Sequence, residues 1–141
     1  MNKFSIRLKE LMNETNPNFL AEKLGLKDEN RIYAWLAGDY IPKIDTIVKL
    51  ANLFECSIDY ILGRTDSDEK VVNDNKIIFH ERLEQIMKQK KLIKQDFRKN
   101  NILSSGLAFS IFNLKNIPYT ENIIKIADYL GVSIDYLIGR I

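Results

Sequence analysis

The chain has 141 residues, of which 45% are hydrophobic and 28% are charged, and its 21 Lys and Arg against 19 Asp and Glu give a net charge of +2. This composition argues against a disordered chain, a collagen-like repeat or an acidic tail. The single cysteine, Cys56, excludes an internal disulfide. No apolar run reaches the roughly 18 residues of a membrane span, and the N-terminus lacks the apolar core of a signal peptide. We therefore expect a cytoplasmic protein that does not enter a membrane.

The first 65 residues predict five short helices. Apolar residues at helical spacing predict the first, with an inward stripe of Phe4, Leu8, Leu11 and Met12. Asn16 suits the N-cap and Pro17 the first position of a second helix, which is expected to end at Gly25. A third is expected over residues 28–37, a fourth over 45–54 and a short fifth after Ser57. The inward residues of the fourth are Ile47, Leu50, Ala51 and Phe54.

A second copy of this pattern follows. The segment S-I-D-Y-I-L-G-R at 57–64 returns as S-I-D-Y-L-I-G-R at 133–140, an offset of 76, and the start of the unit returns at an offset of 75. The stripe of the second copy consists of Phe79, Leu83, Ile86 and Met87. Strand-like alternation is absent, and the stretch between the copies is polar. We therefore predict an all-α protein with two tandem five-helix units, 1–65 and 77–141, joined by a linker over 66–76.

Charge is distributed unevenly between the predicted segments. Residues 1–65 hold 9 basic and 9 acidic side chains, residues 66–76 hold 2 and 4, and residues 77–141 hold 10 and 6. Six of the bases in the second unit fall between residues 88 and 99, beside one acid. A basic stretch of this kind suits contact with phosphates, although a solvated helix face has the same pattern.

The order of helices carries a resemblance to a known family. A-E-K-L-G at 21–25, I-Y-A-W-L-A-G-D-Y-I-P at 32–42 and the S-I-D-Y motif are together similar to the lambda-repressor-like, XRE-type helix-turn-helix family of bacterial and phage regulators. In this geometry a small Ala21 lets the second and third helices approach, and Gly25 takes the left-handed turn between them. The resemblance implies that the third helix lies in the major groove of double-stranded DNA and the second crosses the phosphate backbone.

Carried over to unit 1, the resemblance implies that the third helix buries Ile32 and Trp35. The base-reading candidates are Asn30, Arg31, Tyr33 and Ala34. Asn and Arg have the chemistry to bind adenine and guanine edges, but Asp28 and Glu29 precede them and would face phosphates unfavourably, so residues 28–31 also fit a solvated helix start. The candidates for phosphate contact, which are otherwise ordinary surface residues, are Asn16, Asn18, Tyr40 and Lys43.

Unit 2 departs from the family pattern. Arg98 and Asn101 stand where the family has its small alanine and turn glycine, although Asn101 can still adopt the left-handed turn. Its third helix is expected to have Ser104 as the N-cap and to bury Ala108 and Ile111. Ser105 and Ser110 remain as base-reading candidates, and Phe109 and Phe112 as protein-contact candidates unless a change of register buries Phe112 or both. The phosphate-contact candidates are Lys91, Lys94, Arg98 and Lys99.

The repeated Ser-Ile-Asp-Tyr is interpreted as a helix start. Ser57 and Ser133 would be N-caps, the following aspartates would lie near the positive end of the helix dipole, and the tyrosines would pack inward. Glu55 stands where Gly131 ends the matching helix of unit 2, which predicts either strain or a different helix ending. No phosphate-binding glycine loop, metal-ligand cluster or nucleophile motif appears, so we expect no enzyme, no cofactor and no metal.

Two functional hypotheses remain open. The first is a sequence-specific DNA-binding transcriptional regulator, either a homodimer or one chain acting as an intramolecular pseudo-dimer. The 12 residues 65–76 reach about 40 Å when extended, against roughly 34 Å between half-sites one helical turn apart. The second is a protein-interaction module, such as an antirepressor, an antitoxin or a dimerisation repeat, in which one or both units do not read DNA. An intermediate hypothesis places unit 1 on DNA and unit 2 on a protein partner.

Overall fold

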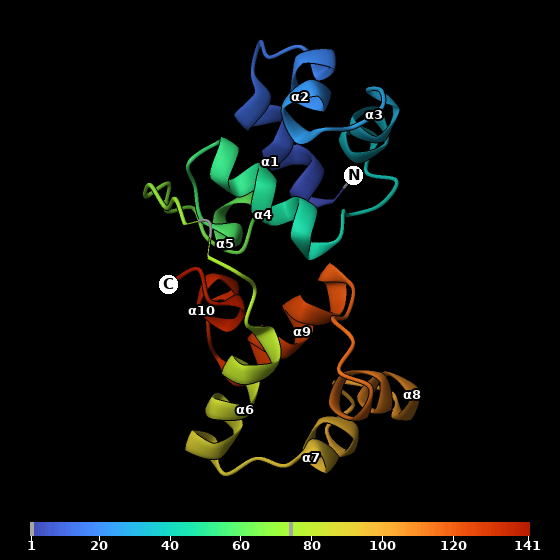
Figure 1. The fold of residues 1–141 in the computed structure, drawn as a ribbon, viewed down its shortest axis with the longest axis vertical. Helices are drawn as coiled ribbons and strands as arrows, with labels where there is room; N and C mark the ends of the chain where they lie inside the picture. Colours follow the sequence, from blue (N-terminus) through green and yellow to red (C-terminus); the bar gives the residue numbers. More distant parts are fainter. Residues whose placement is uncertain (1, 74) are drawn as a thin grey trace. The chain divides into compact units, whose positions relative to one another are not determined.

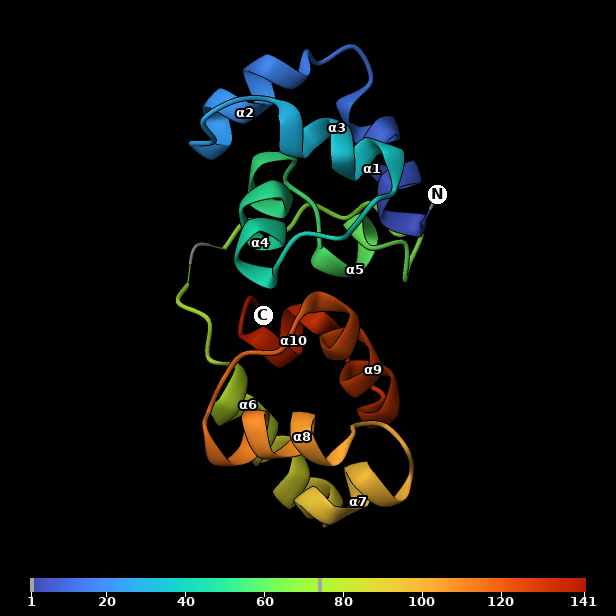
Figure 2. The ribbon, with the colours of Figure 1, turned by 90° about the vertical axis from the view of Figure 1, so that its right-hand side faces the viewer.

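The computed structural model describes residues 2–73 and 75–141, which contain ten α-helices, one π-helical turn and no strand (Figure 1, Figure 2). This confirms the all-α prediction. The chain divides into two compact units, Met1–Asn73 and Asp74–Ile141, referred to below as unit 1 and unit 2. Within the described ranges, no helix combines the length and the apolar character needed to cross a membrane.

Unit 1 packs five helices around one core. They are α1 (Lys3–Met12), α2 (Pro17–Leu24), α3 (Asn30–Ala37), α4 (Ile44–Leu53) and α5 (Ile58–Ile61). Helix α1 contacts α3 and α5, while α2 contacts α3 and α4. The side chains at the centre are Phe4, Leu8, Leu20, Ile32, Trp35, Ile47, Leu50 and Ile58. Burial of these large apolar groups supplies most of the favourable free energy of folding of the unit.

Side-chain caps explain where several helices begin. The Asn16 Oδ1 accepts a hydrogen bond from the Asn18 N–H at 2.8 Å, with Pro17 directly behind it, so the predicted start of α2 is confirmed. The Ser57 Oγ accepts from the Tyr60 N–H at 2.9 Å at the start of α5. Each cap binds one of the four N–H groups that a helix start leaves without an intrahelical acceptor.

Two predicted boundaries of unit 1 were wrong. Helix α3 begins at Asn30 rather than Asp28, because the Asp28 carboxylate accepts the Asn30 N–H at 3.0 Å and holds a turn ahead of the helix. Phe54, predicted to face inward from the fourth helix, is the residue after α4 ends and is only half-buried. Polar side chains that bind a nearby backbone group compete with the helix in the way that Asp28 does.

Unit 2 repeats the element order of unit 1. Its elements are α6 (Phe79–Lys90), α7 (Lys94–Lys99), α8 (Ser105–Ala108), the π-turn η1 (Phe109–Asn113), α9 (Thr120–Leu130) and α10 (Ile134–Ile138). The Ser104 and Ser133 hydroxyls cap α8 and α10 as predicted, accepting from the N–H groups of Leu107 and Tyr136 at 3.2 and 3.0 Å. Helix α10 contacts both α6 and α9. The core of the unit is built mainly on these three helices.

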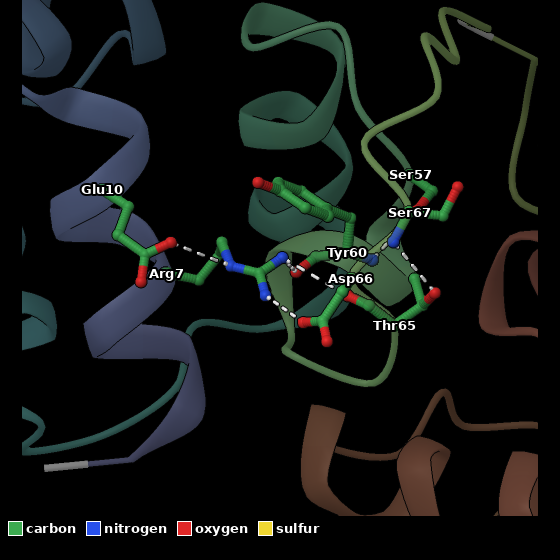
Figure 3. Close-up of polar contacts among 7 residues, drawn as sticks. All are labelled: Arg7, Glu10, Ser57, Tyr60, Thr65, Asp66 and Ser67. Atoms are coloured by element: carbon green, nitrogen blue, oxygen red, sulfur yellow. Dashed lines mark hydrogen bonds and ion pairs between the residues drawn. The ribbon is translucent and has the colours of Figure 1, made fainter.

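The repeated aspartates and tyrosines pair with arginines, which the sequence interpretation had missed. Asp59 forms an ion pair with Arg64, and Asp135 pairs with Arg140. Tyr60 is half-buried rather than packed inward, and the Arg7 guanidinium lies 3.8 Å from its ring centroid (Figure 3). Arg82 lies over the Tyr136 ring at 4.1 Å in the same manner. Each arginine also donates to the tyrosine carbonyl oxygen, at 2.7 and 2.6 Å, and so joins the first helix of its unit to the last.

The start of the predicted linker lies on unit 1. Arg7 Nη2 is 3.2 Å from Asp66 Oδ1 (Figure 3), Lys70 Nζ is 3.4 Å from Glu55 Oε2, and the Asn73 N–H donates to Asn52 Oδ1 at 3.3 Å. Asp66 and both members of the Lys70–Glu55 pair are exposed, and ion pairs at exposed side chains contribute little to stability. These contacts therefore place residues 66–73 along unit 1 without fixing them strongly.

Candidate nucleic-acid interface

The turn between α2 and α3 has the geometry that the sequence predicts. Gly25 has a φ of 71°, its N–H donates to the Glu22 carbonyl at 3.1 Å, and the Leu26 N–H donates to the Ala21 carbonyl at 2.9 Å. Ala21 is buried, and its small side chain allows α2 to contact α3. This pair of bonds after a left-handed glycine closes the end of a helix. The turn thus fixes the direction in which the chain enters α3.

Helix α3 separates a buried side from an exposed one. Ile32 and Trp35 are buried as expected. Asn30 and Arg31 are exposed, Tyr33 is 55% exposed, and Ala34 is half-buried. The exposed side therefore offers an amide, a guanidinium and a phenol, which are hydrogen-bonding groups able to bind base edges in a major groove.

The phosphate-contact candidates of unit 1 lie on either side of α3 in the chain. Asn18 and Tyr40 are exposed. Lys43 directly precedes α4. Asn16 has a structural role as the cap of α2, which uses its side-chain oxygen and leaves the amide nitrogen as the group able to donate to a phosphate. Asp28 binds the backbone of Asn30, so its carboxylate has a local role at the start of α3.

The corresponding turn in unit 2 corrects one predicted equivalence. Asn101 adopts the left-handed conformation with a φ of 59°, as expected, and the Ile102 N–H donates to the Phe97 carbonyl at 2.8 Å. Phe97, and not Arg98, is therefore the counterpart of Ala21. Phe97 is fully buried, and its ring lies 5.3 Å from Phe112 and 5.2 Å from Tyr129, centroid to centroid. An aromatic cluster therefore surrounds the position that corresponds to the small Ala21 of unit 1.

The third helix of unit 2 also ends differently. The Asp39 N–H bonds to the Ala34 carbonyl, whereas the equivalent Ser110 carbonyl accepts from Asn116, one residue later. The left-handed residue shifts accordingly, from Gly38 to Lys115 with a φ of 58°. Leucine at 114 strongly disfavours the left-handed conformation that Gly38 adopts, and the π-turn η1 absorbs the extra residue.

The π-turn changes the surroundings of the unit 2 candidates. Phe109 is 55% exposed, whereas Phe112 is half-buried against Phe97. Ser105 is exposed, and the Ser110 hydroxyl accepts a hydrogen bond from Asn116 Nδ2 at 3.0 Å. The exposed basic candidates are Lys91, Lys94, Arg98 and Lys99. The candidate residues of unit 2 therefore combine exposed positive charge with few side chains able to bind bases.

Sequence reasoning missed Phe97 and the two arginines that lie over tyrosines. The sequence does contain a signal for these arginines, because the Arg7 and Tyr60 of unit 1 recur in unit 2 as Arg82 and Tyr136. Their pairing across more than 50 residues could not be inferred from helical periodicity, which relates only neighbouring turns. Among the residues that the structure describes, no group of three or more His, Cys, Asp or Glu is arranged to hold a metal ion.

Comparison with known families gives a match for part of the chain. Residues 8–61 match the family described as Helix-turn-helix. The match lies within unit 1 and includes α2, the Gly25 turn and α3. Most of unit 1 is therefore similar to a helix-turn-helix domain. No curated protein and no solved structure matches the chain.

Proposed function

We propose that the chain is a sequence-specific DNA-binding transcriptional regulator in which unit 1 places α3 in the major groove. The observation that carries the proposal is the composition of the outward side of α3, within the helix-turn-helix domain. Asn30, Arg31 and Tyr33 extend from a helix whose other side is fixed in the core by Ile32 and Trp35. Base recognition requires hydrogen-bonding groups on a rigid helix, and α3 has both.

Each outward residue of α3 has a chemical role in this proposal. Asn30 binds an adenine edge and Arg31 a guanine edge, each through two hydrogen bonds. Ala34 offers its methyl group to a thymine methyl, and Tyr33 contacts a neighbouring base or phosphate. The phosphate contacts that set the register come from Asn16, Asn18, Tyr40 and Lys43, the first two at the start of α2, which crosses the backbone in this motif.

Unit 2 is proposed to be a second helix-turn-helix copy that adds phosphate contacts with little base reading. Lys91, Lys94, Arg98 and Lys99 are exposed and suit the backbone. At the positions of Asn30, Arg31 and Tyr33, unit 2 has Gly106, Leu107 and Phe109, which provide no side-chain hydrogen bonds. Ser105 and Ser110 are the remaining groups of its third helix that could bind a base.

This difference bears on how symmetric half-sites would be occupied. Two identical half-sites require two identical recognition surfaces, and α3 and α8 differ in chemistry. We therefore favour two copies of the chain, each using unit 1, over an intramolecular pseudo-dimer.

A second candidate function is a protein contact through unit 2. Phe109 is exposed at the position of Tyr33, and Leu114 and Ile117 are exposed shortly after it. Large exposed apolar side chains mark interaction surfaces more often than base-reading surfaces.

The proposal is tested by measuring binding of the full chain to duplex DNA, as wild type and as Arg31→Ala. The substitution is expected to cost about 1–3 kcal/mol on the preferred site and to relax one base position. Lys49→Ala is the matched control, because it removes one positive charge from α4, outside the candidate set. Binding should also weaken steeply between about 50 and 200 mM salt. Unchanged sequence preference in Arg31→Ala would remove Arg31 from the recognition surface.

A further inference from the structure

Unit 2 contains a groove formed by α6, the start of α7 and the end of η1. Its volume is about 350 Å³. Its apolar walls come from Leu83 and Met87 on α6, Leu92 and Ile93 ahead of α7, and Phe112 on η1. Met87, predicted as a core residue, is half-buried because it lines this groove. A space of this size accepts a few apolar side chains of a bound segment.

Positive charge surrounds the apolar walls. Lys88, Lys94 and Lys115 all line the groove, and the acid Glu84 lies 3.9 Å from Lys88 Nζ. At the offsets that relate the two units, the three lysines correspond to Asn13, Asn18 and Asp39. The charge is therefore a feature of unit 2 alone and not of the repeated scaffold.

We infer that this groove binds an acidic amphipathic segment of a protein partner. The apolar side chains of that segment enter between α6 and η1, and its carboxylates face Lys88, Lys94 and Lys115. The inference rests on the protein-contact role proposed for unit 2 and is independent of DNA reading by α3. It gives that role a site and a partner chemistry.

Charge and burial favour this occupant over two others. A second copy of unit 2 would bring eleven bases and seven acids to a surface that is already basic, and like charges at an interface are unfavourable. A DNA backbone has the right charge, but it offers nothing to cover the apolar walls, including Ile93, which is 59% exposed. Apolar anchors surrounded by matched charges suit an amphipathic helix, which is a common mode of peptide recognition.

The test is selection of peptides about 16 residues long from a displayed random library on the immobilised full chain at about 150 mM salt. The enriched peptides are expected to carry net negative charge and apolar residues at i, i+3 or i+4 and i+7. Their affinities are then measured by fluorescence anisotropy with wild type, Ile93→Ser, and the double variant Lys88→Gln with Lys115→Gln, which spares the proposed phosphate contact Lys94. Ile93→Ser removes an apolar anchor while placing a good N-cap residue ahead of α7.

Both groove variants should weaken peptide binding roughly tenfold or more, the order of magnitude for loss of an anchor or of a charge pair. Lys125→Gln is the control, because it removes a charge from α9 and is expected to change the affinity less than about twofold. Peptides that are enriched equally on wild type and on Ile93→Ser would overturn the inference. So would neutral or basic peptides.

Two further probes test the other possible ligands of the groove, which are DNA and a second copy of the chain. Duplex DNA should bind the double lysine variant only slightly more weakly than it binds wild type. A large loss of affinity for DNA with no loss of affinity for the peptides would instead assign the groove to phosphate contacts. A peptide of residues 65–76 tests the acidic linker of a second copy, which should bind at least about tenfold more weakly than the selected peptides. If this peptide binds as tightly as the selected peptides, the ligand of the groove would be the linker of a second copy of the chain and not a separate partner. Failure of α3 to recognise DNA would leave all of these peptide results unchanged.

Discussion

Gly139 is held in a conformation that only glycine adopts easily, and it has no room for a side chain. Its φ is 92°, and a Cβ atom built there would overlap the side chain of Ile78. Gly63 repeats the arrangement in unit 1, where a Cβ would lie 2.7 Å from the Cβ of Lys3. The glycine of each S-I-D-Y motif therefore closes the last helix against the start of its own unit.

Gly139→Ala is expected to lower the free energy of unfolding by roughly 2 kcal/mol or more, because left-handed strain adds to a steric clash. Gly106→Ala is the control: a Cβ there meets nothing within 4 Å, and alanine is the better helix residue, so it should raise stability by about 0.5–1 kcal/mol. Urea denaturation of the full chain measures both values. Equal effects of the two variants would contradict the assigned role of Gly139.

The two Asp–Arg ion pairs differ in burial, and this predicts a difference in energy. The Arg140 side chain is 1% exposed, whereas the Arg64 side chain is 20% exposed. Asp135→Asn should therefore cost about 3 kcal/mol of stability, because it leaves a buried arginine charge poorly compensated. Asp59→Asn should cost about 1 kcal/mol. Thermal unfolding of the two variants compares these losses of stability. An equal or larger loss in Asp59→Asn would contradict the prediction that burial sets the cost.

Short-range features of the residues were predictable from the sequence. The caps Asn16, Ser57 and Ser104 and the left-handed turn at Asn101 depend on neighbouring residues, and the structure confirms them. The pairing of Arg7 with Tyr60 depends on tertiary packing between α1 and α5, which periodicity does not report. The same holds for Phe97, whose role became clear only from the bond that the Ile102 N–H makes to its carbonyl.

At the scale of elements, equivalent helices of the two units end in different ways. Helix α9 ends at Gly131 with a φ of 69°, and its counterpart α4 is followed by Glu55 with a φ of 53°. In both units the next N–H bonds to the equivalent alanine carbonyl, of Ala127 or Ala51. Of the two outcomes that the sequence left open, the structure therefore shows the same ending with a strained residue.

Glu55→Gly is expected to raise the free energy of unfolding by about 0.5–1 kcal/mol, because glycine relieves the left-handed strain. The substitution also removes the ion pair with Lys70, which is exposed and contributes little. Glu55→Ala separates the two effects, since it removes the ion pair and keeps the strain. Chemical denaturation should place Glu55→Gly above wild type and Glu55→Ala at or slightly below it. A destabilised glycine variant would show that the ion pair outweighs the strain.

The helices of unit 1 were predicted to within about two residues, whereas η1 was not anticipated as a π-turn. The sequence leaves open a register change that buries Phe112, but it does not indicate that this change is a π-turn. Its cause is the combination of Leu114 at the position of Gly38 with the large Phe97 beneath Phe112. Each substitution is visible in the sequence, but their joint effect depends on packing volume, which a linear pattern does not contain.

At the scale of the whole molecule, recognition chemistry and charge belong to different units. Unit 1 carries the hydrogen-bonding side chains of α3 but has 10 basic against 12 acidic side chains, and unit 2 carries the excess of bases, with 11 against 7. This division predicts that specificity and non-specific affinity respond to different substitutions.

Replacing Lys91, Arg98 and Lys99 together by alanine should weaken binding to all duplex sequences by a similar factor. It should also reduce the salt dependence, because about 0.9 counterions are released for each phosphate neutralised. The preferred sequence should stay the same, since these residues lie outside α3. Binding isotherms at several salt concentrations, on specific and random duplexes, measure both effects. A changed preference would show that unit 2 also reads bases.

The most direct test of the central claim is selection of bound sites from a random duplex library by the full chain at about 150 mM salt, with Arg31→Ala alongside. We expect wild type to enrich one motif and Arg31→Ala to lose information at one base position of it. Enrichment of no motif above non-specific binding would contradict the assignment of α3 as a DNA-recognition helix.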